Sequence, residues 1–93
     1  MEKVGQVSEK EKKVMLIIFE KRCALEELEI SMNNTDLSER EFRILKEKYA
    51  YIKPLIEEEF NNWWKSNADK YGWKRCVNKV WNINFESNEI FLV

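Results

Sequence analysis

Apolar side chains recur at spacings of three and four residues through the middle of this 93-residue chain. Side chains at that spacing share one face of a helix, so the pattern predicts one long helix over residues 38–71. Pro54 lies inside it, and because the pattern keeps its phase on both sides we expect a kink rather than a break. The residues of this apolar seam are Phe42, Leu45, Tyr49, Ile52, Ile56, Phe60 and Trp63.

The segment before the seam predicts one or two further helices. Ser8–Glu11 and Ser38–Glu41 both match the capping box, in which a Ser hydroxyl and a Glu carboxylate satisfy free amides at a helix start. The first box opens a helix that we expect to run to about Arg22. Ala24–Met32 has a shorter helical pattern that either continues this helix or forms a second one, and Asn33–Asp36 predicts a loop.

After Gly72, a candidate helix C-cap, the apolar period changes from helical to two. Trp81, Ile83 and Phe85 alternate with polar or smaller residues, which predicts a strand. A turn then leads to a second strand at Glu89–Val93, and Trp73–Val77 is a candidate third. We therefore expect an α+β fold and a single domain over residues 1–93. It would combine two or three N-terminal helices, including the long kinked one, with a small C-terminal antiparallel β-hairpin or three-stranded meander.

Composition excludes several classes of function. There is no His, so catalytic triads and His-ligated metals are excluded. With only Gly5 and Gly72 there is no glycine-rich phosphate loop. The 16 basic residues against 17 acidic ones argue against a general binder of polyanions. We expect no catalytic residues, no metal ligands and no cofactor, and therefore no enzyme.

Two further features concern redox chemistry and location. Cys23 and Cys76 are far apart and form no CxxC pair, so we expect free, partly buried thiols. A thiol-exchange role for them stays an alternative. The first residues lack a secretory signal and the longest apolar run, Val14–Phe19, is too short to span a membrane. A cytoplasmic protein with no membrane partner is the expectation.

Aromatic residues make up 13% of the chain and are concentrated after Tyr49. Indoles are enriched in the energetically dominant positions of protein interfaces, so Trp63, Trp64, Trp73 and Trp81 are candidate anchors for a partner. The alternative for Trp64 is burial under the strands. A third interpretation is a stacking platform for single-stranded nucleic acid, with basic side chains around it; those side chains include Lys65, Lys74 and Arg75.

The last strand is apolar on both faces and carries no Pro or Lys that would protect an edge. It is therefore either central in the sheet or kept open for an incoming strand. On the second interpretation Glu89, Ile90, Phe91 and Leu92 join the candidate partner-binding residues.

In order and spacing, the chain resembles the CXXX repeat peptide modification system protein family. The resemblance implies an accessory role in making a ribosomally synthesised, post-translationally modified peptide. Such systems pair a precursor that carries Cys at every fourth residue with a radical S-adenosylmethionine maturase. The segments that carry the resemblance are Val4–Val7, Phe19–Lys21, Ala24–Leu28, Trp63–Trp64, Lys70–Trp73, Trp81–Glu86 and Glu89–Leu92.

The leading hypothesis is a non-catalytic accessory protein that binds the precursor peptide, its maturase, or both. One alternative is a nucleic-acid or regulatory binding module that uses Trp64 and its basic neighbours. Another is a helical homo-oligomer with a structural role, in which the apolar seam pairs between subunits because one hairpin cannot cover it.

Overall fold

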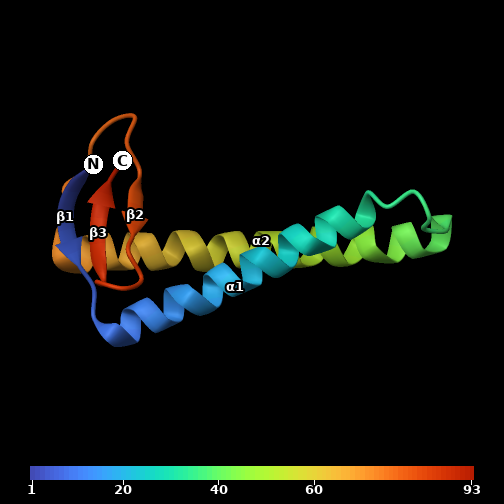
Figure 1. Ribbon diagram of the computed structural model, residues 1–93, viewed down its shortest axis with the longest axis horizontal. Coiled ribbons are helices and arrows are strands. Elements are labelled where there is room, and N and C mark those ends of the chain that lie inside the picture. The colour runs from blue at the N-terminus through green and yellow to red at the C-terminus, as the bar shows by residue number, and fades with distance from the viewer. The chain divides into compact units, whose positions relative to one another are not determined.

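The computed structural model describes residues 1–93 and has an α+β fold (Figure 1). This confirms the fold class predicted from the sequence. The elements in chain order are β1 (Glu2–Gln6), α1 (Glu9–Met32), α2 (Glu39–Tyr71), β2 (Trp81–Ile83) and β3 (Glu89–Leu92).

Both predicted capping boxes lie at the starts of helices. At α1 the Ser8 amide donates to the Glu11 carboxylate at 2.8 Å, and the Glu11 amide donates to the Ser8 hydroxyl at 3.1 Å. At α2 the Glu41 amide donates to the Ser38 hydroxyl at 3.1 Å. These side chains satisfy amides that have no partner within the helix, which explains why the helices begin where they do.

The structure has two long helices, whereas the sequence left open whether there were two or three. α1 continues past Arg22 to Met32, because no Gly or Pro interrupts it, so the pattern at Ala24–Met32 belongs to the same helix. α2 continues through Pro54 without a break. It ends as predicted at Gly72, which has a φ of +62°. The Trp73 amide donates to the Ala68 carbonyl at 3.2 Å, the bond that closes a Schellman C-cap.

The sheet has three antiparallel strands in the order β1-β3-β2. The hairpin of β2 and β3 was predicted. The candidate strand at Trp73–Val77 is wrong, since that segment forms no strand and the N-terminal β1 supplies the third one. β3 therefore lies between the other two, as Figure 1 shows. Pairing of the two ends of the chain has no local sequence signal, which is why the meander prediction missed it.

The chain divides into two compact units by its internal contacts. Unit 1 comprises Met1–Leu16 and Asn62–Val93, and unit 2 comprises Ile17–Asn61. Each helix contributes a segment to each unit, and the single domain expected from the sequence stays a prediction. The largest fully buried side chains, Met15, Ile90 and Leu92, all lie in unit 1.

The two units differ in how well they bury apolar side chains. In unit 1 Trp63, Trp64, Trp73 and one face of the sheet are buried, and a Cβ on Gly5 would collide with the Trp73 indole. In unit 2 only Ile18 and Ile56 are buried, while many apolar side chains along the two helices remain exposed. The sheet unit therefore has a closed aromatic core, and the helical unit does not.

Candidate functional site

The indoles predicted as partner anchors are mostly core residues. Trp63, Trp64 and Trp73 are 7%, 9% and 5% exposed, so they have almost no surface to offer a partner. Their rings contact one another: Trp63 and Trp64 meet edge to face with centroids 4.8 Å apart. Trp81 is half-buried, stacks on Trp64 at 6.3 Å and donates its Nε1–H to the Lys74 carbonyl. These three indoles thus pack in the core of unit 1, as the alternative given for Trp64 expected, and their role as partner anchors stays a prediction with little exposed surface to support it.

The last strand is not an open edge. β3 pairs with β1 on one side and with β2 on the other, so none of its backbone is free for an incoming strand. Ile90 and Leu92 are 0% and 2% exposed, and Glu89 forms an ion pair with Lys3 at 2.9 Å. Of the four predicted residues, only Phe91 reaches a surface hollow, on the β2–β3 side of the sheet.

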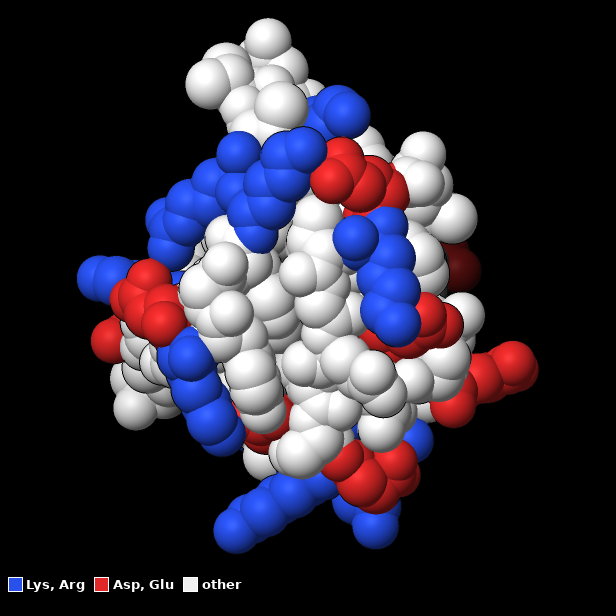
Figure 2. All heavy atoms as spheres, turned by 90° about the vertical axis from the view of Figure 1, so that its left-hand side faces the viewer, with Lys and Arg blue, Asp and Glu red and all other residues white.

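The basic side chains near the indoles are largely paired with acids. Lys74 pairs with Glu2 at 3.1 Å, and Arg75 pairs with Asp69 at 2.9 Å while its guanidinium lies 5.3 Å from the Trp81 ring centroid. Figure 2 shows acidic side chains among the basic ones around an uncharged centre on this face. Because Trp64 is buried as well, the elements of a nucleic-acid platform are not available together.

Unit 1 also holds the most perturbed carboxyl group of the chain. The Tyr71 hydroxyl donates to Glu11 at 2.5 Å and the Lys70 ammonium lies 3.0 Å from the other carboxylate oxygen. Burial alone would raise the pKa of Glu11, but these bonds and those to Ser8 outweigh it and lower the pKa to about 2. The bond to Glu11 in turn raises the pKa of Tyr71. At neutral pH an ionised carboxylate beside a protonated phenol bonds the start of α1 to the end of α2.

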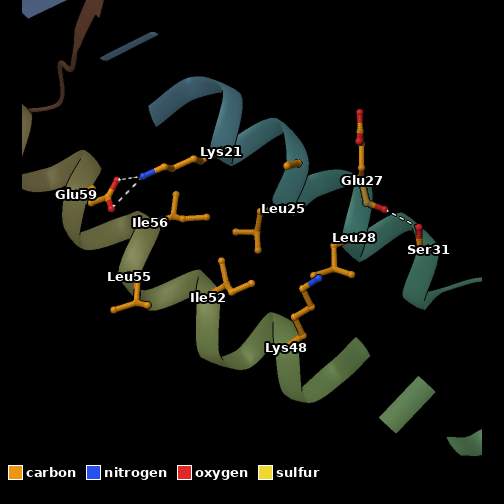
Figure 3. Close-up of a pocket in the computed structure, with 11 residues that line it drawn as sticks. Lys21, Leu25, Glu27, Leu28, Ser31, Lys48, Ile52, Leu55, Ile56 and Glu59 are labelled. Atoms are coloured by element: carbon orange, nitrogen blue, oxygen red, sulfur yellow. Dashed lines mark hydrogen bonds and ion pairs between the residues drawn. The ribbon is translucent and has the colours of Figure 1, made fainter. Parts of the chain in front are cut away.

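An apolar groove lies in unit 2, between α1 and α2, and has a volume of about 590 Å³ (Figure 3). Leu25 and Leu28 of α1 project toward Ile52 and Ile56 of α2 across it. Leu55 is 48% exposed at its side, a large apolar surface left in water. The residues lining the groove are Lys21, Ala24, Leu25, Glu27, Leu28, Ser31, Lys48, Ile52, Leu55, Ile56 and Glu59.

Charged side chains lie at the two ends of the groove. Lys21 of α1 pairs with Glu59 of α2 at 3.0 Å and closes one end. Lys48 of α2 extends toward Leu28 near the other end (Figure 3). An apolar floor with a few charges at its margins is typical of a surface that takes an apolar segment of another polypeptide.

The sequence indicated part of this groove. Ile52 and Ile56 belong to the predicted seam, and Leu25 and Leu28 were on the apolar side of the shorter helical pattern. Leu55, Lys48 and Glu59 were missed. Leu55 widens the apolar arc beside the seam, a signal that was readable from its position next to Ile56 and three residues after Ile52.

The remaining candidates concern the thiols, metal ligands and membrane-spanning segments. Cys23 and Cys76 are free as expected, but both are exposed rather than partly buried. No group of three or more His, Cys, Asp or Glu side chains is placed to hold a metal ion. Neither helix combines the length and the hydropathy that crossing a membrane requires.

Comparisons with known proteins add no assignment. The chain matches no family model, no curated protein and no solved structure. The groove of unit 2, with its exposed apolar Leu55, is therefore the structural feature that bears most directly on function.

Proposed function

We propose that this chain is a non-catalytic accessory protein that works by binding other polypeptides, with the groove of unit 2 as a binding surface. The observation that carries the proposal is the exposed apolar floor of the groove, above all Leu55 at 48% exposure. Leaving such a surface in water is unfavourable by about 25 cal/mol per Å² of apolar area, so a partner that covers it gains affinity.

The partners we propose are the precursor peptide of a Cys-repeat modification system, its radical S-adenosylmethionine maturase, or both. The class of partner comes from the family resemblance. The groove is compatible with it, because Cys side chains at every fourth residue would form a stripe along a helical segment. Cys behaves as a small apolar side chain, so such a stripe suits an apolar floor.

The direct test is titration of this protein into a fluorescently labelled precursor peptide and, separately, into the purified maturase. Leu55→Glu places a carboxylate on the groove floor and should weaken binding by about tenfold or more. Tyr51→Glu is the matched control, because Tyr51 is 74% exposed and does not line the groove. It should leave the affinity unchanged.

Both variants replace exposed side chains, so both should keep the fold, which circular dichroism and indole fluorescence would confirm. Absence of binding to precursor and maturase at tens of micromolar protein would refute the proposal. Equal loss of binding in the two variants would place the contact outside the groove.

A further inference from the structure

The α2 wall of the groove has a symmetric pattern of side chains. Lys48, Ile52, Leu55 and Glu59 all line the groove and follow one another at spacings of four, three and four residues. At about 100° per residue these positions lie within one narrow face of the helix. The pattern reads the same from both ends except that its ends carry opposite charges.

Such a pattern is complementary to itself. If a second α2 lies antiparallel across the first, Lys48 faces Glu59 of the second copy and Ile52 faces Leu55 of the second copy. A two-fold axis then passes between Lys53 and Pro54, and each contact occurs twice. At about 100° per residue, Lys53 and Pro54 lie on the other side of α2 from this face. The proline ring therefore does not obstruct the contact between the two copies.

The side chains have free capacity for these contacts. Leu55 is 48% exposed. Glu59 pairs with Lys21, and both side chains remain 46% exposed, so the carboxylate can accept from a second ammonium. No ion pair within the chain engages Lys48.

We propose that the groove of unit 2 is occupied by a second copy of this chain, in an antiparallel two-fold dimer centred on Lys53 and Pro54 of α2. Two helices from each copy then cover the apolar floor as a four-helix arrangement. The inference rests on the proposed function only in treating the groove as a polypeptide-binding surface. A precursor or maturase that uses the same groove has to displace the second copy.

The test is sedimentation equilibrium of the full chain alone over a wide range of concentrations at low ionic strength, where charge pairs are least screened. The expected result is a reversible monomer–dimer equilibrium. Leu55→Glu should make the chain monomeric, whereas Ala50→Glu, at an exposed position on the opposite side of α2, should leave the equilibrium unchanged.

Charge reversal tests the register. Lys48→Glu and Glu59→Lys each place like charges opposite one another twice, so each variant should dimerise about tenfold more weakly or worse. Mixing the two variants pairs opposite charges again at both contacts, and a heterodimer should form more tightly than either variant alone, although the Glu59→Lys copy still lacks its ion pair with Lys21. A non-specific loss of structure could not be rescued by mixing.

Each outcome has a distinct meaning. A strict monomer at millimolar concentration, a dimer indifferent to Leu55→Glu, or failure of the mixed variants to associate would overturn the dimer. A monomer that still binds precursor through Leu55 would refute the dimer and leave the proposed function standing. A dimer that binds neither precursor nor maturase would support the dimer and refute the proposed function.

Discussion

Among single side chains, Glu11 links more of unit 1 than any other charged residue. Its carboxylate accepts from the Ser8 amide, the Tyr71 hydroxyl and the Lys70 ammonium, and its backbone carbonyl accepts from the Trp63 indole at 3.0 Å. The start of α1 is thereby bonded to the end of α2 within the same unit. Bonds of this kind favour the ionised carboxylate, and they contribute stability only while the carboxylate stays ionised.

The first prediction concerns acid stability. The pKa of Glu11 falls from its ordinary value of 4.5 to about 2 on folding. The stabilisation is therefore complete above the unfolded value and is lost as the pH falls from about 4.5 toward 2. Glu11→Gln should lower the free energy of unfolding by about 1–2 kcal/mol at pH 7, a figure reduced for the partial exposure of the group.

The measurement is urea unfolding at pH 7, 4 and 2.5, followed by indole fluorescence. Gln retains the capping-box geometry, so the variant removes mainly the charge. The difference between variant and unaltered chain should shrink toward the acid end. Glu86→Gln, an exposed carboxyl of the same unit, is the control and should change little. A constant difference at all three pH values would contradict the assignment.

Among the elements, α2 is a continuous helix of 33 residues with a proline in its interior. Proline removes one amide donor and its ring crowds the preceding turn, so an interior proline is about 3 kcal/mol less favourable than alanine. In α2 the helix nevertheless continues on both sides of Pro54.

The second prediction follows from that cost. Pro54→Ala should stabilise α2, and we expect a gain of about 1–3 kcal/mol, because alanine restores the amide donor. Far-UV circular dichroism during thermal unfolding measures it. Glu58→Ala, an exposed position one turn later, should shift the midpoint little. A lower midpoint for Pro54→Ala would mean that packing in unit 2 requires the local geometry that proline imposes.

Across the chain as a whole, burial is unequal between the two units. Unit 1 contains all four Trp residues and the fully buried side chains, whereas unit 2 buries only Ile18 and Ile56 to a comparable degree. Local stability follows the density of buried apolar contacts, so unit 2 should open at lower free energy than unit 1.

The third prediction is that two optical probes will report different transitions. Indole fluorescence reports unit 1 alone, and far-UV circular dichroism reports largely the helical segments of unit 2. In urea the dichroism transition should come first, and raising the protein concentration should delay it if the second copy covers the groove. Coincident transitions at every concentration would instead mark cooperative two-state unfolding.

The parts of the site that could be predicted are those that depend on residues close together in the sequence. The groove floor was partly visible because Ile52, Ile56, Leu25 and Leu28 obey helical periodicity, which is local. The position of Leu55 beside this face was also readable, but its exposure depends on how far α1 covers α2. The burial of Trp63 and Trp73 could not be predicted, because composition gives the number of aromatic side chains and not which elements cover them.

Interactions between residues that are close in the sequence could be predicted from the sequence alone. Such interactions include both capping boxes, the Gly72 cap and the β2–β3 hairpin. Each depends on residues that are close in the sequence, so it forms independently of how the rest of the chain folds. The addition of β1 to β3, the burial of three indoles and the opening of the groove required three dimensions. Each depends on contacts between segments that are distant in the sequence. The apolar surface buried by such a contact stabilises it, and the amount depends on both segments together, so neither segment alone predicts it.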